Sequence, residues 1–279
     1  MKKSTFLTRF WLSAVGLVLI ACLVSPLPIF SQTPIRQQTA ADQQQFAKLQ
    51  QSYQQQLLDY REKERLYFLS EKQYRQLQTL AALDDFIQTA QQLFIARNQA
   101  LSTYGQILAT VLTDTHGLDL SQKKLALLLL TETNRQIDGL NQNQKTPGTK
   151  ETVAENYQQF NELADDIETV FNYGLGLIKL GRLRNVADQM TAILPKVNER
   201  INERNSGYLL AEKQRNLKEI SQQLADIQTD IKQLQKNRLN LDGDNPRFNR
   251  QNLQILQQDL NKIYNQLIRN QEFINEVLQ

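Results

Sequence analysis

The sequence predicts an all-α protein made of long helices, arranged as antiparallel coiled-coil hairpins or as an elongated helical bundle. The first observation is that no Gly and no Pro occurs from Ile35 to Tyr104, a stretch dominated by strong helix formers. The second is that apolar residues alternate between spacings of three and four in several long segments, as in helices that pack along heptad seams. Few segments are β-branched enough to indicate strands.

Residues 1–31 stand apart from the helical pattern, and we interpret them as a signal peptide or membrane anchor. Lys2, Lys3 and Arg9 precede an apolar run over residues 10–24, which a proline-containing segment follows. A positive segment, an apolar segment and a helix-breaking segment in this order are typical of an exported protein.

The sequence is compatible with three fates of this leader. The chain is cleaved after Ser31, or Cys22 is lipidated, or residues 10–30 stay as a membrane tether long enough to span a bilayer. In each case the positive charges stay in the cytoplasm and the bulk of the chain lies outside it. We therefore expect an extracytoplasmic protein.

Charge and composition exclude several classes of function. The 32 Lys and Arg exceed the 29 Asp and Glu by three, and Lys2, Lys3 and Arg9 all lie in the leader. The remainder is therefore near neutral, which argues against a nucleic-acid partner. Cys22 is the only Cys and His116 the only His, so we expect no disulfide, no cysteine nucleophile and no His-pair metal site.

For residues 32–141 the sequence predicts one long helix followed by a short one. The long helix would run without a break to Thr113–Gly117, where polar residues and a glycine end it. Asp119 or Ser121 would cap the short helix, because their side-chain oxygens can accept a backbone N–H of its first turn.

Residues 142–279 form the second predicted region. A third helix begins near residues 149–152 and is kinked near Pro195, which removes one backbone donor. The segment Asn205–Gly207 is the next weak point of the helical pattern.

The C-terminal part of this region, residues 208–279, is predicted to be a helical hairpin. Its two heptad segments flank the turn Asp242–Pro246, in which Asn245 is the expected N-cap and Pro246 the first helical residue. Two long helices joined by so short a loop are antiparallel neighbours.

Four seams follow the alternating spacing over at least eight positions each. They comprise Leu80, Leu83, Ile87, Ala90, Phe94, Arg97, Leu101, Tyr104, Leu108 and Val111; Val153, Tyr157, Phe160, Ala164, Ile167, Phe171, Gly174 and Ile178; Leu217, Ile220, Leu224, Ile227, Ile231, Leu234, Arg238 and Leu241; and Leu253, Leu256, Leu260, Ile263, Leu267, Asn270, Ile274 and Val277. Arg97 is the only polar member of the first seam. Such a sustained repeat predicts left-handed supercoiling.

An aromatic residue recurs at every seventh position of the first predicted helix. This aromatic strip consists of Phe46, Tyr53, Tyr60, Tyr67 and Tyr74. On a straight helix the strip would drift by about 20° per heptad, so it stays on one side only if the helix supercoils around a partner. The partner is another helix of the same chain or a second chain that docks on the strip, and stacking on glycans is a third interpretation.

Gly174, Gly176 and Gly181 lie close together in a helical pattern, where each costs about 1 kcal/mol relative to Ala. Close approach of another helix explains them. A hinge, or a functional groove beside the basic residues of segment 179–184, is the alternative.

Other polar groups have simpler interpretations than a site. His116 is expected to be an exposed loop residue, the acidic residues of segment 162–168 a solvated helix face, and Asp242–Asn245 a turn and not half a calcium loop. We therefore predict no catalytic residue, no cofactor and no metal.

These observations lead to an expected function without enzymatic activity. The chain is expected to be a structural or interaction protein of the bacterial cell envelope, acting as a spacer or adaptor. Its partner would be another protein, or a second copy that associates through the helical seams. The alternative is a holdase-type extracytoplasmic chaperone that grips unfolded chains.

Overall fold

The computed structural model of the chain describes residues 40–143, 148–204, 206–239 and 248–278. The predicted leader and the predicted Asp242–Pro246 turn lie outside these ranges. The described part consists of helices and short connections without a strand, which confirms the all-α fold. The helices are α2 (Ala40–Leu77), α3 (Leu80–Asp114), α4 (Leu120–Asn143), α5 (Lys150–Arg204), α6 (Gly207–Arg238) and α7 (Arg250–Leu278).

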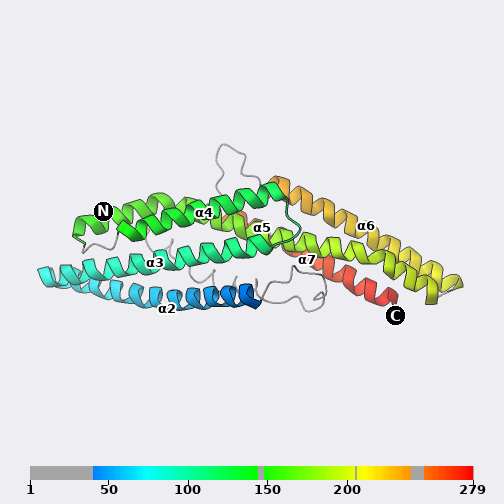
Figure 1. Cartoon of the computed structure of the whole chain (residues 1–279), viewed down its shortest axis with the longest axis horizontal. Coiled ribbons are helices and arrows are strands. Elements are labelled where there is room, and N and C mark those ends of the chain that lie inside the picture. The colour runs from blue at the N-terminus through cyan, green and yellow to red at the C-terminus, as the bar shows by residue number, and fades with distance from the viewer. Residues whose placement is uncertain (1–39, 144–147, 205, 240–247, 279) are drawn as a thin grey trace.

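The helices form an elongated molecule with α5 along most of its length (Figure 1). α5 has 55 residues, which corresponds to about 80 Å for an ideal helix. α3 and α4 contact its first part, with α2 packed on α3, whereas α6 and α7 contact its second part. We call α2, α3, α4 and the first part of α5 the four-helix half. The second part of α5, with α6 and α7, is the three-helix half.

The single long helix predicted up to residue 113 is wrong, because the chain folds back after Leu77 and α2 and α3 form a hairpin. Gln78 takes a positive φ of 51°, and Thr79 caps α3 by accepting the backbone N–H of Ala82 at 3.3 Å. A left-handed residue other than Gly costs about 1–2 kcal/mol. The hairpin offsets this cost, because it buries apolar side chains of α2 and α3 against each other.

The next helix ends lie where the sequence places them. α3 ends at Asp114, and the Lys123 ammonium donates hydrogen bonds to two backbone carbonyls at this end. The Asp119 carboxylate accepts the backbone N–H of Ser121 at 2.9 Å and so caps α4.

α5 continues through Pro195 to Arg204 and then gives way to α6 at the predicted weak point. Gly207 opens α6 with a φ of 62°, a conformation that glycine adopts without steric cost. The N-cap of α7 is Asn249 and not Asn245, because α7 begins at Arg250 and the Asn249 amide oxygen accepts the Asn252 N–H at 3.0 Å.

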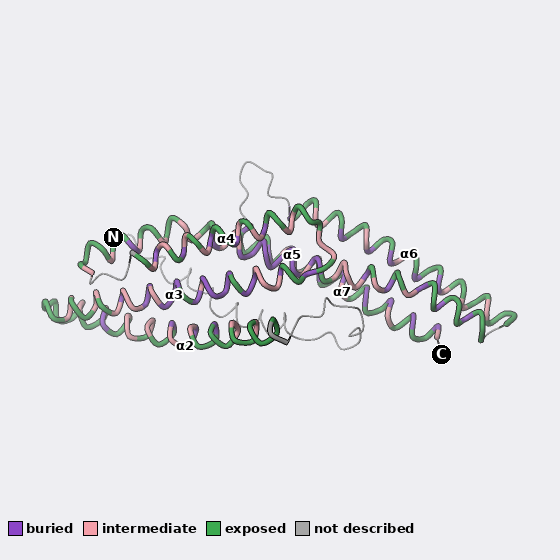
Figure 2. Tube along the Cα trace, in the orientation of Figure 1, coloured by how far each residue is buried: buried purple, intermediate pink, exposed green. Residues whose placement is uncertain are grey.

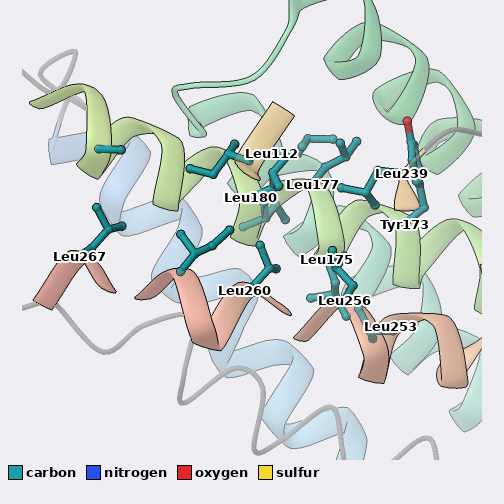
Figure 3. Packing of buried hydrophobic residues seen from close by; sticks show 14 of the residues in the cluster. Leu112, Tyr173, Leu175, Leu177, Leu180, Leu239, Leu253, Leu256, Leu260 and Leu267 are labelled. Carbon is teal, nitrogen blue, oxygen red and sulfur yellow. The ribbon is translucent and has the colours of Figure 1, made fainter. Parts of the chain in front are cut away.

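The two halves meet in the middle of α5, where residues 171–178 are all buried. A helix that is buried on every side needs neighbours all around it. Figure 3 shows the side chains that surround this segment, which come from α3, from α7 and from the residue after α6: Leu112, Leu253, Leu256 and Leu239.

Buried residues line the inner sides of the described helices (Figure 2), although two predicted seam positions, Leu80 of α3 and Arg238 of α6, are exposed. In α7 all eight predicted positions are buried, including the polar Asn270. In α6 the buried residues are Leu217, Ile220, Leu224, Ile227 and Ile231, all on the predicted seam. The heptad spacing therefore identified the contact faces of both helices.

Candidate functional site

The aromatic strip of α2 lies against α3 of the same chain. Tyr53 stacks on Tyr104 with ring centroids 5.5 Å apart, and Tyr67 and Tyr74 lie 5.4 and 5.9 Å from the ring of Phe86. Tyr53 and Tyr60 are each 5% exposed. The intrachain interpretation is the one that the structure shows, and the strip of Phe46, Tyr53, Tyr60, Tyr67 and Tyr74 is not an open docking surface for a second chain.

Burial raises the pKa of four tyrosines of this interface. Removal from water raises the pKa of Tyr53 and Tyr67 to about 12, and it also raises the pKa of Tyr104. The pKa of Tyr60 is raised first by burial and then by the Glu64 carboxylate, to which its hydroxyl donates a hydrogen bond at 3.0 Å. The strip therefore contributes rings and hydroxyl donors, and no charge, to the bundle.

Arg97, the one polar residue of the first seam, lies at the centre of the four-helix half. Its guanidinium carbon is 3.2 Å from the ring centroid of Phe160 and 5.0 Å from that of Phe94. Burial lowers the pKa of Arg97 to about 9, while Tyr60 and Tyr157 nearby act in the opposite direction. Arg97 is thus a cation at neutral pH, stabilised by aromatic faces instead of a carboxylate.

Several buried polar atoms of the four-helix half lack a partner among the described residues. Nε of Arg97 donates to the Asn98 amide oxygen at 3.2 Å, but Nη2 of Arg97 and Nδ2 of Asn98 have no acceptor among the described protein atoms. Gln56, Asn134 and Asn141, also in helices of this half, each have a buried amide oxygen without a donor. A core of this kind selects one pairing of helices, since a slipped pairing would bury the Arg97 charge away from its rings.

The predicted close approach of another helix holds for Gly176, which faces Leu256 of α7, whereas Gly181 lies close to the α3–α4 connection. A Cβ on Gly181 would lie 2.6 Å from Thr115 Cγ2 and 2.9 Å from the backbone oxygen of His116. A Cβ on Gly176 would lie 2.9 Å from a methyl of Leu239. Gly174 is different, because a Cβ there would be in ordinary contact with Leu130 at 3.6 Å.

The acidic segment 162–168 is split between solvent and a helix cap. Glu162 and Asp166 are exposed on the surface of α5. Glu168 has a defined role that its sequence position did not indicate, because its carboxylate accepts the backbone N–H of Arg250 at 2.9 Å, at the first residue of α7. His116 is exposed in the α3–α4 connection, as expected.

Large apolar side chains are exposed at both ends of the molecule. At the α2–α3 hairpin, Leu77 is 63% and Leu80 is 74% exposed. At the α5–α6 hairpin, Tyr208 is 84% and Leu209 is 50% exposed, and Phe273 of α7 is 46% exposed. Clustered apolar side chains in water mark surfaces that bind a partner. These ends, and not an internal site, are the candidate functional surfaces.

Neither a metal-binding cluster nor a membrane-spanning helix occurs among the described residues. The described residues contain no group of three or more His, Cys, Asp or Glu side chains that could hold a metal ion. No helix between residues 40 and 278 has an apolar stretch long enough to cross a bilayer.

Comparison with known proteins gives no relative. No protein-family model matches the chain, and searches of curated proteins and of solved structures find no similar protein.

Proposed function

We propose that the protein is a non-enzymatic spacer or adaptor of the bacterial cell envelope that binds partners through its two ends. The observation that carries this proposal is the combination of an unbroken 55-residue helix with exposed apolar side chains at the hairpins on either side. A helix of this length separates the two ends by tens of ångströms. The leader over residues 1–31 supports a location outside the cytoplasm.

The location is tested by mass spectrometry of the protein isolated from its source cell. We expect an N-terminus near Gln32, or an intact or lipidated leader in the membrane fraction. An unmodified full-length chain in the cytoplasm contradicts the proposal.

The spacer role is tested by placing a photo-cross-linking amino acid at single positions in living cells. Leu77 and Tyr208 report on the two ends, and Asp138, exposed on the side of α4, is the matched control. We expect cross-links from each end to envelope components and much weaker ones from Asp138. Equal cross-linking at all three positions contradicts binding through the ends.

A holdase-type chaperone is the second candidate, and the exposed side chains of Leu77, Leu80, Tyr208 and Leu209 favour it. A holdase would suppress aggregation of a chemically denatured client at stoichiometric amounts. Replacement of these four residues by Ser would abolish the suppression. If the wild-type protein leaves client aggregation unchanged, the spacer role is the better account.

A further inference from the structure

A groove with an acidic rim lies between α6 and α7 near the free end of the three-helix half. Its volume is about 280 Å³, and Ile220 and Val277, both buried, are among the residues that line it. Glu212, Glu219 and Glu276 are exposed along the groove, and Lys213 is its only basic residue. None of the three carboxylates forms an ion pair with another described residue.

Exposed apolar side chains border this acidic groove. Leu209 and Phe273 belong to its lining and are 50% and 46% exposed. On α6 the lining runs from Leu209 to Gln223, a rise of about 21 Å for an ideal helix. The groove thus offers apolar surface and three negative charges over four turns of helix.

A complementary surface lies at the opposite end of the molecule, on the side of α2 that faces away from the bundle. This basic-apolar face consists of Leu58, Arg61, Arg65, Phe68, Leu69 and Lys72, all of them exposed. At 100° per residue these six lie within an arc of about 100°, and they also extend over about 21 Å. Glu62 is the one acidic residue at its edge.

The charges of the two surfaces are opposite in sign and two of them on each surface have the same spacing. Arg65 and Lys72 are seven residues apart, as are Glu212 and Glu219. Two helices that lie side by side can therefore pair both cations with both carboxylates, since seven residues return to nearly the same side of each helix. Each surface also carries a third charge, Arg61 on the face of α2 and Glu276 of α7 at the groove.

We propose that the protein associates head to tail with copies of itself, with the basic-apolar face of α2 in one copy docked in the acidic groove of the next. A second copy is favoured over a foreign partner because both complementary surfaces belong to this chain. The surfaces lie at opposite ends of the molecule, toward the ends of α2 and α6 (Figure 1). Each contact is heterologous and leaves one free face and one free groove, so association continues beyond the dimer into open chains or closed rings.

The proposal does not depend on the cellular location or on any other partner. It predicts association that grows with protein concentration and weakens with salt, because the paired charges are exposed and are screened at high ionic strength. Sedimentation velocity of the protein as isolated, in about 0.1 M and about 1 M salt, measures both dependences. We expect species larger than a dimer at low salt and a shift toward monomer at high salt.

Two charge reversals test the pairing directly. The first is Glu212→Lys with Glu219→Lys and Glu276→Lys, and the second is Arg61→Glu with Arg65→Glu and Lys72→Glu. All six positions are exposed, so both variants should keep the wild-type circular dichroism and melting temperature. Each variant alone is expected to be monomeric at concentrations where the wild type associates. An equimolar mixture of the two is expected to associate again, because each variant then meets a complementary surface.

A control with the same change of charge is Asp138→Lys with Glu155→Lys and Glu162→Lys, exposed positions outside both surfaces. This variant should associate like the wild type. A wild-type protein that is monomeric at every concentration and salt overturns the proposal, as does a mixture of the reversed variants that stays monomeric. Binding of the monomeric wild type to anionic lipid vesicles, with loss in the α2 variant only, would assign the α2 face to a membrane and overturn it too.

Discussion

The two halves of the molecule bury different kinds of side chain although the same heptad spacing runs through both. Beyond the shared middle of α5, the described core of the three-helix half is Leu, Ile and Val with Ala187 and Met190, and its one buried polar residue is Asn270. The four-helix half buries several: Ser70, Arg97, Asn98, Ser102, Thr103, Thr133 and Asn156. Spacing alone therefore identifies which face of a helix is inward, but it does not say whether the interface is apolar or polar.

This difference has an energetic consequence. Each buried polar group costs stability unless a hydrogen bond compensates it, and the unpartnered atoms are concentrated in the four-helix half. We infer that the four-helix half is the less stable of the two and the more selective in its helix pairing. The following predictions test this comparison, from the largest expected effect to the smallest.

Alkaline pH should unfold the four-helix half first. The tyrosines whose pKa is raised by burial, Tyr53, Tyr60, Tyr67 and Tyr104, all lie in α2 or α3. Above pH 10 a tyrosine ionises in the unfolded chain but not in the folded one, so the unfolded state binds fewer protons. Stability is then lost as pH rises from 10 to the folded pKa, by up to about 1.4 kcal/mol per pH unit for each buried tyrosine.

Arg97 acts in the opposite direction. Its pKa is about 9 in the folded state, against an ordinary value of 12.5, so the cost of its buried charge is relieved between these values. The stability gained from this one group does not offset the stability lost from the four tyrosines. The order in which the two halves unfold is measured by thiol labelling in a Cys22→Ser background. Ala100→Cys reports on the four-helix half and Leu224→Cys on the three-helix half. We expect the Ala100 site to become reactive at a lower pH, and the reverse order would contradict the comparison.

Truncation of the apolar core should have the next largest effect. Leu224 is fully buried on the α6 seam, and Leu224→Ala is expected to lower the free energy of unfolding by about 2–5 kcal/mol, because it leaves a cavity. Urea unfolding followed by circular dichroism measures the change. The control is Lys218→Ala on the exposed side of the same helix, which should change stability by less than about 0.5 kcal/mol. Similar costs for the two variants would mean that this seam is not a close-packed core.

The difference between apolar burial and specific polar contacts also explains which features could be predicted from the sequence and which could not. The α7 seam could be read from spacing because burial of Leu and Ile is non-directional and needs only the correct face. The α2–α3 turn was missed because Gln78 carries no signal for a positive φ, which tertiary contacts impose on it. Glu168 could not be recognised as an acceptor for the first turn of α7, since its partner Arg250 lies 82 residues away.

The candidate functional surfaces could also be predicted only in part from the sequence. The heptad spacing of the strip correctly indicated a buried face of α2, but which helix covers it depends on the unpredicted turn. Arg97 did leave a signal, as the single cation of an otherwise apolar seam. The acidic groove joins residues of α6 and α7 that are at least fifty positions apart, so no local pattern contains it.

Replacement of Arg97 by an apolar residue of similar length tests the cost of the polar core. Arg97→Met removes a desolvated charge that has no carboxylate partner among the described residues, so we expect it to be neutral or to raise stability by about 1–4 kcal/mol. Arg61→Met, on the exposed face of α2, is the control and should have little effect. Thermal unfolding of both variants measures the difference. A loss of more than about 2 kcal/mol would mean that the contacts with Phe94 and Phe160 outweigh the desolvation.

The smallest expected effects come from the glycines where the two halves meet, and they differ in sign. In Gly181→Ala the new methyl would lie 2.6 Å from Thr115 and 2.9 Å from the backbone oxygen of His116, which cannot rotate away. We expect a loss of about 1–3 kcal/mol from this overpacking. In Gly174→Ala the methyl has ordinary contact with Leu130, so the helix gains about 0.5–1 kcal/mol from the lower entropy of the unfolded chain. Chemical unfolding of this matched pair separates close approach from a hinge. A hinge would be stiffened by either alanine, and both variants would then gain stability.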